Sequence, residues 1–94
     1  MSLIKHFLHG KAFEGSSKRT SNIFNPATGE NTAKVNLASK ADIDFAVNKA
    51  KQAFNEWSNK PPVTRARVLF KFKELIEKNE DELIKIIVSE HGKV

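Results

Sequence analysis

The sequence predicts an α+β fold in which antiparallel strands come first and three helices follow. Two changes in pattern support this prediction. Between residues 4 and 37, short stretches of alternating apolar and polar residues are separated by glycine- and proline-containing turns, which is typical of hairpins. From residue 39 onward, apolar residues recur every three or four positions, which is typical of helices, and polar or proline-containing breaks divide this region into three segments.

The strand region is expected to contain two hairpins. Residues 4–13 form the first, with its turn at His9-Gly10-Lys11, where glycine tolerates a positive φ. Residues 14–19 are small and polar and predict a loop. Residues 20–25 and 32–37 form the second hairpin around the sequence NPATGE, in which proline, asparagine and glycine favour a tight turn.

The second strand of that ribbon has a clear alternation. Its apolar residues are expected to face a core, and its polar residues are expected to face water. The apolar set is Ala33, Val35 and Leu37, and the polar set is Thr32, Lys34 and Asn36. Because an isolated two-stranded ribbon is marginal in water, we expect the helices to pack against the strands and against each other.

The first helix is predicted over residues 39–59. Ser39 is a favourable N-cap, and Asp42, three residues later, completes a capping box. Pro61 and Pro62 end the segment because proline supplies no interior amide donor. A single apolar stripe runs along this helix and consists of Ile43, Val47, Ala50, Phe54 and Trp57.

The second and third helices are predicted over residues 62–78 and 79–91. Asn79 is expected to cap the third helix, with Glu82 as its reciprocal partner and Gly92 as the C-cap. The third helix is apolar almost all round, which predicts burial on most sides. Little of the 94-residue chain is left to cover it, so we expect these residues to belong to a larger protein.

Composition excludes several classes of function. The chain contains no cysteine, which rules out a disulfide framework, a thiolate metal site and a cysteine nucleophile within these residues. The net charge of +5 is moderate, and basic and acidic residues are interspersed. No segment is long and apolar enough to span a bilayer, and the first ten residues do not follow a secretory pattern, so a cytoplasmic location is expected.

Several residue groups suggest chemistry, but each has a simpler structural interpretation. The three histidines lack further metal ligands at suitable positions, and the acidic pairs lie in predicted first turns, where they favour the helix dipole. A basic surface with two phenylalanines suggests nucleic-acid binding, but the favoured interpretation is a solvated helix face over core aromatics. Trp57 could anchor a partner, but a core position is favoured because Trp57 continues the apolar stripe of the first helix. We therefore expect no catalytic, cofactor-binding or metal-binding residue here. The residues weighed are His6, His9, His91, Asp42, Asp44, Glu80, Asp81, Glu82, Lys60, Arg65, Arg67, Lys71, Lys73, Phe70, Phe72 and Trp57.

An ordered set of segments resembles the N-terminus of the aldehyde dehydrogenase superfamily. The set consists of a strand–glycine turn–strand opening, NPATGE, AVNKAKQAFNEWS, a proline-containing break, and DELIKIIVSEHGKV. The segment RARVLFKFKELIEKNEDEL and the closing EHGKV are similar to the coenzyme-A-acylating methylmalonate-semialdehyde dehydrogenases. The resemblance covers the chain from residue 4 onward.

This resemblance implies an enzyme in which a cysteine thiolate attacks an aldehyde, NAD accepts hydride, and coenzyme A takes the acyl group. The substrate would be malonate or methylmalonate semialdehyde, which would also lose carbon dioxide, and the product would be acetyl- or propanoyl-coenzyme A, in valine and inositol breakdown. Residues 1–94 would be the N-terminal portion of the cofactor-binding domain, without the catalytic and oligomerisation parts. The segment alone would be inactive and bind no cofactor; its partners would be the remainder of a homo-oligomeric enzyme, with no nucleic acid and no membrane.

Two alternatives remain open at this point. One is a small basic module that binds nucleic acid, which steeply salt-dependent binding would support. The other is a helical interaction domain that associates with itself through exposed apolar faces.

Overall fold

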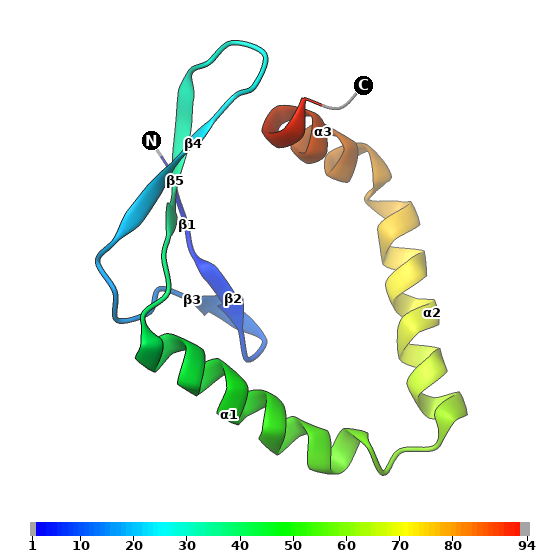
Figure 1. Ribbon diagram of the computed structural model, residues 1–94. Helices are drawn as coiled ribbons and strands as arrows, with labels where there is room; N and C mark the ends of the chain where they lie inside the picture. The colour runs from blue at the N-terminus through cyan, green and yellow to red at the C-terminus, as the bar shows by residue number, and fades with distance from the viewer. Residues whose placement is uncertain (1, 93–94) are drawn as a thin grey trace.

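The computed structural model describes residues 2–92 and confirms the α+β fold (Figure 1). The strands come first and three helices follow, as predicted. Met1, and Lys93 and Val94 of the closing EHGKV, lie outside the described residues. The elements are β1 (Ser2–Ile4), β2 (His6–Leu8), β3 (Lys11–Phe13), β4 (Thr20–Phe24), β5 (Asn31–Asn36), α1 (Lys40–Trp57), α2 (Pro62–Lys78) and α3 (Glu80–His91).

The strands form two small sheets. β2 and β3 make the predicted antiparallel hairpin, with His9 and Gly10 both at positive φ in its turn. β5 lies at the centre of a three-stranded sheet, antiparallel to β4 and parallel to β1. The sequence prediction began the first strand at residue 4 and therefore missed β1. A parallel pair has no connecting turn of its own, so the short strand carries no local signal.

The NPATGE segment forms the predicted turn between β4 and β5. The Asn25 amide donates to the Glu30 carbonyl at 2.8 Å, and the Gly29 amide donates to the Asn25 carbonyl at 2.8 Å. The Asn25 side chain accepts from the Ala27 amide at 2.9 Å. These hydrogen bonds stabilise the turn in the way that its asparagine, proline and glycine residues predict.

The alternation predicted for β5 is correct at its start and wrong at Asn36. Ala33 is buried and Val35 half-buried, as expected for the inner face. Asn36 was expected to face water, but it is buried, and its amide Nδ2 donates to the Glu14 carbonyl at 3.0 Å. The loop that follows β3 crosses this end of the strand, and a buried amide is tolerated because it has a hydrogen-bond partner.

The junction between α2 and α3 differs from the prediction. Asn79 makes no side-chain cap for α3, and no reciprocal bond with Glu82 is present. The Asn79 side chain instead donates to the Leu75 carbonyl at 2.7 Å, at the end of α2. Asn79 is thus both the C-cap of α2 and the N-cap of α3. Its side-chain amide donates to a carbonyl at the end of α2, where the last carbonyls have no partner within the helix. The predicted C-cap is confirmed: Gly92 is left-handed, with φ 73°.

The helices pack against the strands only near the start of α1, where Phe45 stacks on Phe13, and not along their full length as expected. The chain instead follows an open ring, in which α1, α2 and α3 form an arc that returns to the turn between β4 and β5 (Figure 1). Its radius of gyration is 16.9 Å, against about 12 Å for a compact domain of this length. Its thinnest dimension is 16 Å. The described residues therefore form a flat frame without a large core of its own.

The predicted core residues of the helices are exposed within the described chain. No side chain of α2 or α3 is buried, and the large apolar side chains of α3 are 38% to 51% exposed. Phe54 and Trp57 of α1 and Phe70 and Phe72 of α2 are exposed as well. The periodicity correctly located apolar faces, but residues 2–92 supply no neighbour to cover them.

Candidate functional site

A hydrogen-bonded polar cluster lies at the start of α1 and centres on Asp42. The Asp42 amide donates to Ser39 Oγ at 3.1 Å, and the Ser39 amide donates to Asp42 Oδ2 at 2.9 Å. This pair is the predicted capping box. Asp42 is only 6% exposed, so the cap is also a buried structural joint.

The loop between β3 and β4 completes this joint. The Ser16 amide donates to Asp42 Oδ1 at 2.9 Å, and Ser16 Oγ lies 3.2 Å from the same oxygen and 2.8 Å from Ser39 Oγ. Gly15, at φ 85°, lies so close that a Cβ there would be 2.7 Å from Asp42 Oδ2. Sequence reasoning assigned residues 14–19 only to a loop. The contact joins positions 26 residues apart, and no local pattern signals it.

Hydrogen bonding sets the charge of Asp42. The Ser39 and Ser16 amides, followed by the hydroxyls of the same two residues, lower the pKa of Asp42 from 3.8 to about 2, against an opposing effect of burial. The carboxylate is therefore ionised at neutral pH and already accepts several hydrogen bonds. A general base that works near neutral pH needs a pKa close to 7 and a free lone pair aimed at substrate. Asp42 fits a structural role.

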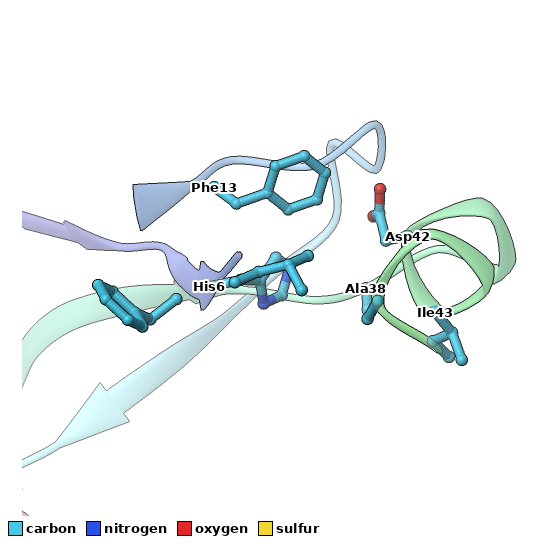
Figure 2. A pocket seen from close by; sticks show the side chains of 8 residues that line it. His6, Phe13, Ala38, Asp42 and Ile43 are labelled. Carbon is cyan, nitrogen blue, oxygen red and sulfur yellow. The ribbon is translucent and has the colours of Figure 1, made fainter. Parts of the chain in front are cut away.

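An apolar pocket lies beside this joint, between the β2–β3 hairpin and α1 (Figure 2). In Figure 2 Phe13 and His6 lie on the strand side, with Asp42 and Ile43 on the helix. Phe13 also stacks on Phe45 of α1 with ring centroids 5.2 Å apart. The pocket measures about 160 Å³, below the roughly 300–1,000 Å³ of most small-molecule sites. Its lining is His6, Phe7, Leu8, Phe13, Ala38, Asp42, Ile43 and Ala46.

The other groups weighed from the sequence are scattered. His6 lies in β2, His9 in the hairpin turn and His91 at the end of α3. Among residues 2–92, no three histidine, aspartate or glutamate side chains gather as metal ligands would. Glu80, Asp81 and Glu82 occupy the first turn of α3, as predicted. Asp44 pairs with Lys40 at 3.3 Å on the α1 surface.

Three of the five basic residues weighed from the sequence lie beside acidic neighbours. Lys71 lies 3.6 Å from Glu74, and Lys73 lies 3.7 Å from Glu77, both along the surface of α2. Lys60 lies 3.8 Å from Glu56 at the end of α1. Alternating charges of this kind are typical of a solvated helix face.

Residues 2–92 do not form a binding site for the phosphates of a dinucleotide. Such a site needs glycines in a tight turn from a strand into a helix N-terminus. Here Gly10 and Gly29 lie in turns between strands, Gly15 abuts Asp42, and Gly92 ends α3. Among residues 2–92, no helix is both long and apolar enough to cross a bilayer.

The largest surface feature is a series of exposed apolar helix faces. Phe54 is 64% exposed and Phe70 is 69% exposed. An open, apolar recess of about 490 Å³ lies between α2 and α3. It is lined by Phe72, Leu75, Ile76, Asn79, Glu82, Leu83 and Ile86. Exposed apolar side chains thus lie on all three helices.

Comparison with known proteins assigns these features to one family. The chain is 41% identical over 93 residues to a malonate-semialdehyde dehydrogenase of Pseudomonas aeruginosa, and 38% identical over 93 residues to one of Bacillus pumilus. Each match covers 99% of this chain but only 18% and 19% of those relatives, respectively. The chain therefore spans less than a fifth of the length of these relatives.

Solved structures agree in fold. A methylmalonate-semialdehyde dehydrogenase from Oceanimonas doudoroffii superposes with a TM-score of 0.92 at 43% identity, over 97% of this chain and 18% of that one. A Sinorhizobium meliloti structure, assigned to the same enzyme and complexed with NAD, gives 0.92 at 47% identity, over 95% and 18%. Residues 13–94 match the model of the aldehyde dehydrogenase family. The chain belongs to the aldehyde dehydrogenase family.

Proposed function

We propose that residues 1–94 are the N-terminal structural segment of an NAD-dependent, coenzyme-A-acylating aldehyde dehydrogenase. Its substrate is malonate or methylmalonate semialdehyde, which loses its carboxyl group as carbon dioxide while NAD accepts hydride and coenzyme A takes the acyl group, and its product is acetyl- or propanoyl-coenzyme A. The observation that carries the proposal is the match of nearly the whole chain to solved methylmalonate-semialdehyde dehydrogenases at 43% and 47% identity. The nucleophilic cysteine and the cofactor sites belong to parts of the enzyme outside these residues.

The exposed helix faces support a scaffolding role for this segment. In the proposed enzyme, the apolar sides of α1, α2 and α3 pack against the remainder of the same polypeptide. Burial of apolar surface stabilises by roughly 25 cal/mol per Å², and an aromatic side chain such as Phe54 contributes about 3 kcal/mol when fully covered. The proposed partner is thus the rest of a cytoplasmic homo-oligomeric enzyme that acts in valine or inositol breakdown.

A chimaeric enzyme tests the proposal. Residues 1–94 replace the aligned N-terminal segment of the Pseudomonas aeruginosa malonate-semialdehyde dehydrogenase, of which the match covers 18%. We expect the chimaera to reduce NAD when given malonate semialdehyde and coenzyme A, within about tenfold of the unmodified enzyme, because a compatible scaffold changes the barrier by little more than about 1.4 kcal/mol. A soluble but inactive chimaera would count against the assignment.

A matched pair of variants tests the packing of α1. Phe54→Asp places a charge on the apolar face, and we expect it to abolish assembly of the chimaera. Gln52→Asp adds the same charge elsewhere on α1 and is expected to leave assembly and activity unchanged. Equal behaviour of the two variants would contradict burial of the Phe54 face.

The two alternative functions give different results with the 94-residue chain alone. A nucleic-acid-binding module would bind duplex DNA or RNA with a steep salt dependence. The ion pairs of Lys71 and Lys73 with acidic neighbours reduce the charge available for such binding. Self-association is favoured by the exposed apolar faces and would appear as a concentration-dependent mass in sedimentation. Under the proposed function the chain alone shows no dehydrogenase activity and no tight binding of NAD.

A further inference from the structure

We infer that two contacts, which form and break together, hold the β2–β3 hairpin on the start of α1. The first is the stack of Phe13 on Phe45, with ring centroids 5.2 Å apart and ring planes 14° from parallel. The second is the hydrogen bond that the Ser16 amide donates to Asp42 Oδ1 at 2.9 Å. We call this pair of contacts the clasp. It lies within the chain and does not depend on the proposed function.

The two contacts lie close together on both segments. Phe13 is the last residue of β3, and Ser16 lies three residues further along the chain. Asp42 and Phe45 are likewise three residues apart, both in α1. Residues at this spacing share one face of a helix, so the chain meets one side of α1 twice. Because only two residues separate Phe13 from Ser16, closing one contact brings the other pair together at a small entropic cost.

The ring stack has a further neighbour on each side. His6 is paired with Phe13 in the register of β2 and β3, and their ring centroids are 6.4 Å apart. Lys49 lies one turn beyond Phe45 in α1, and its Nζ is 5.4 Å from the centroid of the Phe45 ring. This distance is within the roughly 6 Å reach of a cation–π interaction. Phe13 and Lys49 are both half-buried. Four side chains thus connect the hairpin with α1.

The clasp uses a different side of α1 from the apolar stripe that the sequence predicted. At about 100° per residue, Phe45 lies about 200° round the helix from Ile43, where the stripe begins. Val47 and Phe54 of the stripe remain 51% and 64% exposed. The hairpin can therefore be held on α1 while most of the stripe stays free. The coupling of the two contacts makes the hairpin and the first turns of α1 one cooperative unit.

Amide hydrogen exchange in the full 94-residue chain, measured by NMR, tests the coupling. The readout is the Ser16 amide, which belongs to one contact, and the substitutions are made in the other. Phe45→Leu removes the ring stack at a position far from Ser16 in the sequence, so it reaches this amide only through the fold. We expect Ser16 to exchange about fivefold faster, as the loss of one aromatic pair implies. Phe7→Leu is the matched control, because Phe7 belongs to the same hairpin but is 80% exposed; Ser16 should then exchange at the parent rate.

A double variant shows whether the two rings act through one contact. Phe13→Leu alone should have the same effect as Phe45→Leu. Because either change already removes the stack, the double variant should exchange less than twice as fast as either single variant. An unchanged Ser16 rate in Phe45→Leu would overturn the clasp, as would single effects that multiply in the double variant.

Lys49 provides a second comparison that keeps both rings, for use if a leucine variant loses helix content by circular dichroism. Lys49→Gln removes the cation over Phe45 and should speed Ser16 exchange about twofold. Lys49→Arg keeps the cation and should exchange at the parent rate. Equal Ser16 rates in these two variants would contradict the link between the ring stack and the hydrogen bond.

Discussion

Replacing Ser39 with alanine measures how much the hydrogen bonds between α1 and the β3–β4 loop stabilise this part of the fold. The change removes the acceptor of the Asp42 amide at 3.1 Å and the contact with Ser16 Oγ at 2.8 Å. Loss of an N-cap costs about 1 kcal/mol, and an exposed hydroxyl hydrogen bond adds about 0.5 kcal/mol. The sum of about 1.5 kcal/mol corresponds to roughly a tenfold change in a local opening equilibrium.

Amide hydrogen exchange measured by NMR reads this opening directly. In Ser39→Ala, the Asp42 amide loses its acceptor and with it its protection, and the Ser16 amide, which keeps Asp42 Oδ1 as its acceptor, should exchange roughly ten times faster than in the parent chain, in line with that free energy. Ser58→Ala is the matched control, because Ser58 Oγ makes only a 3.4 Å exposed contact with the Asn55 carbonyl. Exchange at Asp42 that is unchanged in Ser39→Ala, or equally changed by Ser58→Ala, would refute the role assigned to the joint.

Two further predictions concern Asp42. Because its pKa is lowered from 3.8 to about 2, ionised Asp42 stabilises the fold at pH values above 3.8 and loses this effect as the pH falls through about 2. Between pH 2 and 3.8, the thermal midpoint should therefore change less steeply with pH in Asp42→Asn than in the parent chain. An equal slope in the two proteins would contradict the hydrogen bonds assigned to Asp42. Gly15→Ala should displace the Asp42 carboxylate, since a Cβ at position 15 would lie 2.7 Å from Oδ2. The pKa of Asp42 should therefore rise in an NMR titration. An unchanged Asp42 pKa would show that the β3–β4 loop moves away instead and that the hydrogen bonds of the carboxylate are kept.

Features that depend on neighbouring residues were predictable from the sequence. The capping box needs only Ser39 and Asp42, and the turn between β4 and β5 needs only the residues of NPATGE. The three helices were likewise located by apolar spacing and by the breaks at Pro61 and Asn79. In each case the interaction lies within about one helical turn or one hairpin loop, so the local sequence contains both partners.

Features that join distant segments were missed. Ser16 meets Asp42 across 26 positions, and Asn36 meets Glu14 across 22. Each polar residue resembles a solvent-facing residue until its partner is known. The parallel pairing of β1 with β5 belongs to the same class. A single sequence records which residues are polar but not which distant backbone group will satisfy them.

The contrast between hydrogen-bonded joints and exposed apolar faces supports the structural role proposed for this chain. At the start of α1 and in the β4–β5 turn, Asp42 and Asn25 make their hydrogen bonds to other residues of this chain. These bonds form without any other part of the enzyme. Along the helices the reverse holds, because Phe54, Phe70 and the α3 residues remain open to solvent. Under the proposed function, the remainder of the enzyme covers those apolar sides, and the hydrogen-bonded joints set where each helix meets it.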